Sequence, residues 1–246
     1  GVSRLHALLQ GKRAYWDRKA ADLLEKNAGV FSMSDEDLAQ FAQRFLDDLA
    51  ETDWLGTWGF VPGEALLADI FCRKATHFDP VALEPYYFDR PWSAALHAKR
   101  VLVIHPFEKT IRAQYSKRDL LFENPDILPN FELLTVPAVQ SVAGNTVPFQ
   151  SWFEALDWMK RQIDELQFDV GLVGAGAYGV PLAAHIRRRG RIAMHLGGAL
   201  QIMFGIKGRR WDAMPAVNRF YNEHWVRPAA AETPSASGAV EAGCYW

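Results

Sequence analysis

The chain has 246 residues, of which 49% are hydrophobic and 23% charged, and its formal net charge is −2. This composition suits one α/β domain, and the slightly negative net charge gives no overall positive potential that would attract nucleic acid. Its two cysteines lack metal or redox spacing, and no apolar run has the length of a membrane span or the form of a signal peptide. We therefore expect a cytoplasmic protein with no nucleic-acid partner, no transmembrane segment and no disulfide framework.

The first 52 residues are predicted to be helical. Apolar spacing indicates helices over Val2–Gln10 and Tyr15–Lys26, and Gly29 is expected to close the second. Ser34 should cap a third helix whose first turn is Asp35-Glu36-Asp37 and which ends near residue 51. This acidic triplet also reads as D-x-D, a pattern that can hold a divalent ion, but helix capping accounts for it fully.

The middle of the chain alternates strands and helices. Trp54–Trp58 reads as a strand, and Glu64 falls in the first turn of the next helix. Glu64 is either a surface carboxylate favoured by the helix dipole or an acid at the edge of the sheet. Val101–His105 is the clearest early strand, and a helix over Phe107–Phe122 follows it. His105 is either a ligand contact or base at the strand end, or a hydrogen-bonded structural residue.

The second half carries two glycine loops. Glu132–Val136 reads as a strand, and Phe149–Leu166 as a long amphipathic helix. The short strand Asp169–Val173 then runs into a G-x-G-x-x-G motif at residues 174–179, and a helix follows. Ile192–His195 reads as the next strand, and a second glycine turn and a short helix follow it. Right-handed crossover connections would place both loops at the carboxyl edge of one sheet, where open α/β sheets bind ligands.

Backbone N–H groups in such loops, at helix N-termini, form a site for phosphate or pyrophosphate. The predicted nucleotide-binding residues of the loops are Gly174, Ala175, Gly176, Tyr178, Gly179, Gly197 and Gly198. Three cations follow the second loop and either fold over a diphosphate or form a solvated turn; they are Lys207, Arg209 and Arg210. Alternatively, the glycines only allow a helix and a strand to pack closely, and no ligand binds at the loops. The candidate catalytic residues are His105, Glu64 and His195.

A dinucleotide site would need an acidic residue about 20 residues after the motif to hold the ribose. Met194 and His195 occupy that region instead, so no NAD or FAD is expected.

Together the elements predict an α/β, Rossmann-like domain with about five or six mainly parallel strands flanked by helices. We expect a single domain over residues 1–226, with residues 1–52 as its helical N-terminal part. Residues 227–246 are rich in Ala, Pro, Ser and Gly and predict an extended C-terminal tail. The aromatic pair that ends this tail indicates that it docks back on the body.

Several strings resemble a group of bacterial proteins encoded with polysaccharide-biosynthesis genes, which look related to glycosyltransferases of the GT-D fold. The strings cover most of the chain after residue 27 and include NAGVF, LEPYYFDRPW, VLVIHPFEKTIRAQY, LLTVPAVQSVAGN, GAGAYGVPLAAHIRRRG, HLGGALQIMFGIKGRRWD, YNEHWVRP and GCYW. The resemblance implies transfer of a sugar from a nucleotide-diphosphate donor to a glycan acceptor in bacterial surface polysaccharide biosynthesis.

The resemblance also implies an acidic motif near the N-terminus that holds a divalent cation, Mn²⁺ or Mg²⁺, on the donor diphosphate. The sequence contains no convincing copy of it, so the motif is expected either upstream of Gly1, in a longer chain, or not at all. A noncatalytic nucleotide- or glycan-binding module of a larger glycan-assembly protein is the alternative function. No metal-ligating residues are assigned within the chain.

Overall fold

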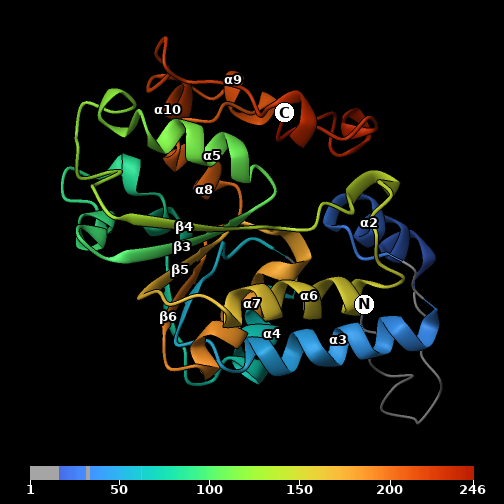
Figure 1. The fold of residues 1–246 in the computed structure, drawn as a ribbon. Helices are drawn as coiled ribbons and strands as arrows, with labels where there is room; N and C mark the ends of the chain where they lie inside the picture. Colours follow the sequence, from blue (N-terminus) through green and yellow to red (C-terminus); the bar gives the residue numbers. More distant parts are fainter. Residues whose placement is uncertain (1–16, 32–33, 62) are drawn as a thin grey trace.

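The computed structural model describes residues 17–31, 34–61 and 63–246. These residues form six strands, all paired in parallel, with helices packed around them (Figure 1). Four strands make the main sheet in the order β4-β3-β5-β6; they are β3 (Arg100–His105), β4 (Glu132–Pro137), β5 (Val170–Val173) and β6 (Ile192–His195). The predicted α/β class, with parallel sheets flanked by helices, is therefore confirmed.

The main sheet is covered on both faces, which explains its nearly continuous apolar strands. Successive side chains of β3 point to opposite faces, so Val101 and Val103 join one core cluster and Leu102 and Ile104 the other. The first cluster includes residues of α5 (Glu108–Tyr115) and α8 (Ala199–Met203), and the second includes residues of α6 (Trp152–Asp164) and α7 (Gly179–Arg188). Helices on both faces leave the ends of the strands as the open edges of the sheet.

The pairing register brings the carboxyl ends of the four strands to one edge. Ile104 of β3 is level with Val136 of β4 and Val173 of β5, and Val173 is level with His195 of β6. The segments that follow the four strands therefore start side by side. This edge corresponds to the ligand-binding edge expected from the glycine loops.

A second, two-stranded sheet lies apart from the main one. It pairs β1 (Trp54–Gly56) with β2 (Thr76–Phe78), also in parallel. The predicted strand Trp54–Trp58 is thus two residues too long, and its partner β2 was not predicted at all. Both strands have only three residues and are largely exposed, so neither carries the apolar run by which a buried strand is recognised.

The N-terminal helices follow their predicted caps. Helix α2 (Arg18–Ala28) ends at Gly29, whose φ of 76° is left-handed, and α3 (Asp35–Leu49) begins with a capping box. In that box the Ser34 hydroxyl accepts from the Asp37 amide, and the Asp37 carboxylate accepts from the Ser34 amide. Capping therefore explains the acidic triplet at residues 35–37. The predicted helix Val2–Gln10 lies outside the described residues.

Other predicted helices have different bounds in the structure. The segment Phe107–Phe122 forms the shorter α5 and a 3₁₀ turn at Arg118–Leu120, and α6 is shorter than the predicted Phe149–Leu166. Helix α4 (Glu64–Phe71) follows β1, whereas α9 (Arg209–Asp212) and α10 (Pro215–Asn218) are single turns near the C-terminus. No helix in the described ranges is long and apolar enough to cross a membrane.

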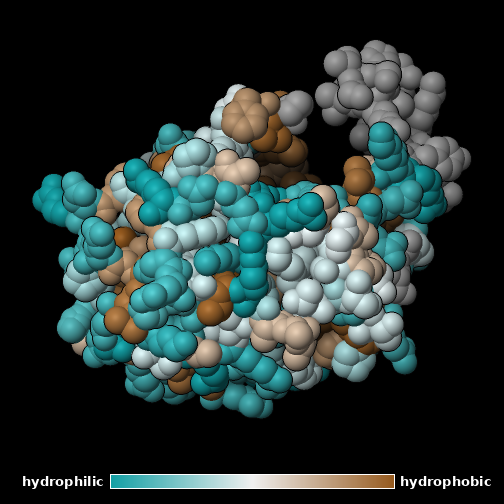
Figure 2. All heavy atoms as spheres, turned by 90° about the horizontal axis from the view of Figure 1, so that it is seen from above, coloured by the Kyte–Doolittle hydropathy of each residue, from teal (hydrophilic) through white to brown (hydrophobic). Residues whose placement is uncertain are grey.

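The chain after residue 226 lies against the body, beside α5 and α9 (Figure 1). The Trp246 ring is 6.1 Å from the Phe107 ring, and the Tyr245 carbonyl accepts from Gln201 Nε2 at 2.8 Å. Figure 2 views the molecule from this side and shows a mainly hydrophilic face on which hydrophobic side chains form separate spots. The terminal aromatic residues contact buried side chains beneath this face.

Candidate functional site

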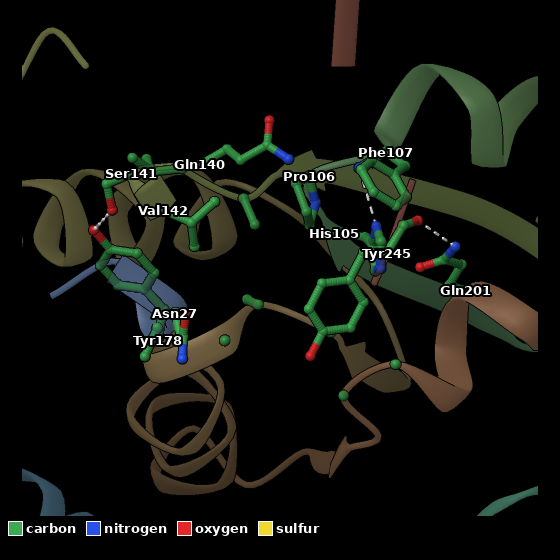
Figure 3. Close-up of a pocket in the computed structure, with 18 of the residues that line it drawn as sticks. Asn27, His105, Pro106, Phe107, Gln140, Ser141, Val142, Tyr178, Gln201 and Tyr245 are labelled. Atoms are coloured by element: carbon green, nitrogen blue, oxygen red, sulfur yellow. Dashed lines mark hydrogen bonds between the residues drawn. The ribbon is translucent and has the colours of Figure 1, made fainter. Parts of the chain in front are cut away.

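A cavity of about 290 Å³ opens at the carboxyl edge of the main sheet. The segments after all four strands line it, and α2 and the C-terminus complete it. The lining residues are Asn27, Ala28, His105, Pro106, Phe107, Ala138, Val139, Gln140, Ser141, Val142, Gly174, Ala175, Gly176, Tyr178, His195, Gly197, Gly198, Gln201, Tyr245 and Trp246. In Figure 3, Tyr178 and Asn27 border one side of the cavity, and His105, Tyr245 and Gln201 border the other.

The structure brings most of the predicted site residues together here. Of the thirteen, the eight that line the cavity are His105, Gly174, Ala175, Gly176, Tyr178, His195, Gly197 and Gly198. Gly179 lies immediately behind the wall, because a Cβ added there would be 2.1 Å from His195 Nε2. The remaining four predicted residues do not line the cavity; they are Glu64, Lys207, Arg209 and Arg210.

His105 is buried at the end of β3, and its tautomer follows from one hydrogen bond. The Phe107 amide donates to His105 Nδ1 at 3.0 Å (Figure 3), so Nδ1 is the acceptor nitrogen and the neutral ring carries its proton on Nε2. Burial lowers the pKa of His105 to about 3, so the ring stays neutral at physiological pH. His105 is therefore arranged as a hydrogen-bonded, neutral residue with a donor at Nε2, which fits its reading as a structural residue or ligand contact better than its reading as a base.

His195 differs from His105 in having no hydrogen-bond partner among the described residues. Its ring packs against Gly179 at the N-terminus of α7, where only a glycine leaves it room. Burial lowers the pKa of His195 to about 4, although the side chain keeps partial contact with solvent. This neutral imidazole can accept a proton or a hydrogen bond from a bound group.

The glycine loops present free amide groups to the cavity. Gly174 is an exception, because its amide donates to the Ile104 carbonyl at 2.9 Å and is not available to a ligand. In the described part of the chain, no protein acceptor is present for the amides of Ala175, Gly176, Gly197 and Gly198. Two loops on neighbouring strands thus offer several donors to one ligand.

A buried hydrogen-bond chain fixes the wall opposite His105. Ser141 Oγ donates to the Gly29 carbonyl at 2.6 Å, so the Tyr178 hydroxyl must donate to Ser141 Oγ across 3.1 Å. The Tyr178 ring also stacks on Trp152 at 5.0 Å, and burial raises the pKa of its hydroxyl. These contacts join the loops after β4 and β5 to the end of α2, and they make Tyr178 a rigid wall residue.

Two polar side chains of the cavity were missed by the sequence reasoning. Gln201 is fully buried on α8, and its Nε2 donates to the Lys207 and Tyr245 carbonyls. Its Oε1, and Oδ1 of Asn27, are buried without a hydrogen-bond partner in the described residues. An unsatisfied buried acceptor is costly, so both oxygens are candidate ligand contacts. No sequence motif marks either residue.

The three cations after the second loop contact aromatic side chains or the C-terminal tail instead of the cavity. Lys207 Nζ lies 5.3 Å above the Tyr221 ring, and Arg209 donates to the Ala242 carbonyl at 3.2 Å. Arg210 pairs with Glu241 and lies 4.9 Å from the centre of the Tyr245 ring. For the two arginines the reason is long-range: the tail returns to this turn from more than 30 residues away and provides their partners.

Glu64 does not line the cavity, so its position does not support the catalytic role considered for it. Its carboxylate accepts from the amides of Trp58 at 3.0 Å and Gly59 at 2.8 Å. Trp58 and Gly59, shortly after β1, thus contact the first turn of α4. The surface-carboxylate interpretation of Glu64 fits these contacts, and the acid at the sheet edge does not.

A divalent cation does not fit the residues around the cavity. Every lining side chain is neutral, and none of them is a carboxylate, the side-chain ligand that Mg²⁺ and Mn²⁺ prefer. Within the described ranges, no group of three or more His, Cys, Asp or Glu residues is placed to hold a metal ion.

No protein-family model matches the chain, and neither a curated protein nor a solved structure matches it.

Proposed function

We propose that this chain is a Rossmann-like, glycosyltransferase-like protein that binds a nucleotide-diphosphate sugar in the cavity at the carboxyl edge of its main sheet. The observation that carries the proposal is the pair of glycine loops on adjacent strands, which line one cavity and carry amide groups with no acceptor among the described residues. Such amides stabilise phosphate oxygens without any cationic side chain. The resemblance to polysaccharide-biosynthesis proteins supplies the sugar nucleotide as the ligand class.

The cavity volume limits what can bind inside it. About 290 Å³ is at the lower limit of ligand pockets, which span roughly 300–1,000 Å³. We infer that the cavity holds the diphosphate and one neighbouring group of the donor, and that the rest of the donor extends outside. In a transfer reaction, His195 is the better candidate for the base because neither of its ring nitrogens has a hydrogen-bond partner among the described residues, and His105 would donate from Nε2.

A noncatalytic nucleotide- or glycan-binding module is the second candidate. The neutral lining favours it, because the leaving diphosphate of a transfer reaction develops charge that a cation normally compensates. The resemblance alone suggests that the first candidate acts in a cytoplasmic pathway of bacterial surface polysaccharide synthesis. A divalent cation, which the resemblance also implies, would need ligands other than the side chains that line the cavity.

Thermal-shift and calorimetric titration with UDP, GDP, CDP, TDP and NAD, each with and without Mn²⁺, tests the proposal. We expect at least one nucleoside diphosphate to bind, and NAD not to bind. Gly176→Ala should weaken that binding by at least about tenfold, since its amide would move away from the phosphate.

Gly190→Ala is the matched control. Gly190, like Gly176, has a left-handed φ, which is 73° at Gly190 and 53° at Gly176. Gly190 lies at the opposite end of α7, with open space around it. The backbone strain of the two substitutions is therefore similar, and only Gly176→Ala should affect the ligand. Equal affinity in both variants would show that the loop does not touch the nucleotide.

A further inference from the structure

A second and larger hollow adjoins the cavity. This groove, of about 1070 Å³, lies between β6 and α7 on one side and the β1–β2 sheet on the other. His195 and Gly197 line both the groove and the cavity. A molecule in the groove and a molecule in the cavity would therefore meet at the imidazole of His195, which has no hydrogen-bond partner in the described part of the chain.

Backbone groups of two unpaired strand edges face this groove. The Leu196 amide donates to Val173 of β5 at 2.9 Å, and residues of a parallel strand alternate in direction, so the N–H and C=O of Ala193 and His195 point away from β5. On β1, the Asp53 carbonyl accepts from the Thr76 amide at 2.8 Å, so the backbone groups of Trp54 and Gly56 point away from β2.

All four of these residues, Ala193, His195, Trp54 and Gly56, line the groove. In the described part of the chain, β6 pairs only with β5, and β1 only with β2. The groove thus offers hydrogen-bond donors and acceptors along both of its sides.

Exposed aromatic side chains border the same groove. Trp54 is 67% exposed and Trp58 53% exposed, and both line it together with Phe78. An indole ring usually buries most of its large apolar surface, so two exposed indoles beside one groove indicate a surface that a ligand covers. At the rim, the exposed ion pair between Asp53 and Arg187 adds charged hydrogen-bonding groups.

We propose that this groove binds an oligosaccharide, the acceptor of the reaction whose donor occupies the cavity; this inference rests on the proposed function. The flat C–H faces of sugar rings match exposed indoles, and hydroxyl groups, which both donate and accept, match the free strand edges. The continuity of groove and cavity at His195 places the two ligands in contact. A peptide strand would pair with the same edges, but it would leave the Trp58 ring, beyond the end of β1, without a role.

Calorimetry and ligand-observed NMR with maltohexaose, cellohexaose and chitohexaose, each at millimolar concentration, test the groove in the full chain. Trp58→Ala lies outside the strand and should weaken binding of the best oligosaccharide by about tenfold, as expected for loss of an aromatic contact. Trp54→Ala should do the same, with its circular dichroism spectrum checked against the wild type. Phe88→Ala removes an aromatic residue that is 42% exposed and outside the groove, and it is the matched control.

The outcomes separate this inference from the proposed function. Nucleotide binding without binding of any oligosaccharide overturns the groove assignment and leaves the cavity assignment standing. Oligosaccharide binding that depends on Trp58, with no nucleotide binding, overturns the proposed donor site and leaves a glycan-binding groove. Displacement of the oligosaccharide signals by a Lys-flanked Val–Thr repeat peptide, together with unchanged affinity in Trp58→Ala, would identify a strand-binding site and overturn the proposal.

Discussion

His105 and His195 end strands of one sheet, yet their surroundings give them different chemistry. The imidazole of His105 has a fixed tautomer because a backbone amide occupies Nδ1, whereas none of the described residues forms a hydrogen bond with the His195 ring. Burial lowers the pKa of His105 to about 3 and that of His195 to about 4. Such groups link the stability of the fold to pH as well as shaping the site.

The two lowered pKa values predict how stability depends on pH. In the unfolded chain each histidine takes up a proton below about pH 6.5, while in the folded chain it stays neutral until the pH falls towards the lowered values. The contribution of each histidine to the free energy of unfolding should therefore be fully present above about pH 6.5. As the pH drops from there towards 4, each histidine should lower that free energy by at most about 1.4 kcal/mol per pH unit. Urea unfolding at a series of pH values measures this slope.

His105→Asn isolates the contribution of one histidine. The Asn side-chain oxygen can replace Nδ1 as acceptor for the Phe107 amide, but it does not titrate. We expect the variant to lose less stability between pH 6.5 and pH 4 than the wild type, whereas His97→Asn, at an exposed position, should lose as much. Parallel curves for wild type and His105→Asn would show that His105 does not cause the slope.

At the scale of elements, α3 and α7 are joined by two kinds of ion pair. Arg187 and Arg188, in the last turn of α7, reach the end of α3 and the segment after it. The Asp48 carboxylate is fully buried and accepts from Arg188 and, at 2.6 Å, from Arg44. Asp53, by contrast, is 62% exposed and pairs with Arg187 at 2.8 Å. Both are pairs of an aspartate with arginine, so they allow the effect of burial on stability to be compared directly.

Asp48→Ala should destabilise the fold more than Asp53→Ala. Removing one partner of a buried pair costs about 3–5 kcal/mol, but Arg44 and Arg188 keep 36% and 37% exposure, and water can compensate part of the loss. We expect a loss of roughly 2–3 kcal/mol for Asp48→Ala and a clearly smaller loss for Asp53→Ala, because solvent screens the exposed pair. Urea denaturation of both variants tests this, and equal losses would contradict the importance of burial.

The elements also mark where sequence reasoning succeeds. Strands β3, β4, β5 and β6 were predicted within one residue of each end, because a parallel strand covered on both faces requires an apolar run. The capping box at Ser34 was predictable for a similar reason, since its partners are three residues apart. Strand β2 left no such pattern because it is short and exposed.

The sequence located the cavity more reliably than it assigned chemical roles to the residues around it. Glycine loops after strands mark a sheet edge, and eight predicted residues line the cavity there. The partners of Arg209 and Arg210 lie in the tail, and the hydrogen bond that sets the tautomer of His105 depends on the turn after β3. Contacts of this kind depend on three-dimensional placement, which periodicity does not report.

At the scale of the whole molecule, one buried carboxylate attaches the C-terminal segment to the body. Glu232 is 7% exposed, and its carboxylate accepts from the Lys109 amide at 2.7 Å and the Thr110 amide at 3.2 Å, at the start of α5. The Thr110 hydroxyl also donates to it, and Trp246 Nε1 donates to the Glu232 carbonyl at 3.2 Å. A residue 122 positions away thus supplies the N-terminal cap that α5 lacks locally.

Glu232→Ala should release the tail and open the cavity that Tyr245 and Trp246 line. The loss of charge-assisted hydrogen bonds to two amides and a hydroxyl should cost about 1.5–3 kcal/mol and should expose the chain after residue 226 to protease. Limited proteolysis followed by mass spectrometry should find faster cleavage there than in wild type or in Glu241→Ala, which removes a tail carboxylate that is 48% exposed. Nucleotide affinity should fall in parallel, because two residues of the cavity wall leave with the tail. Wild-type cleavage rates in Glu232→Ala would mean that the aromatic contacts hold the tail without this carboxylate.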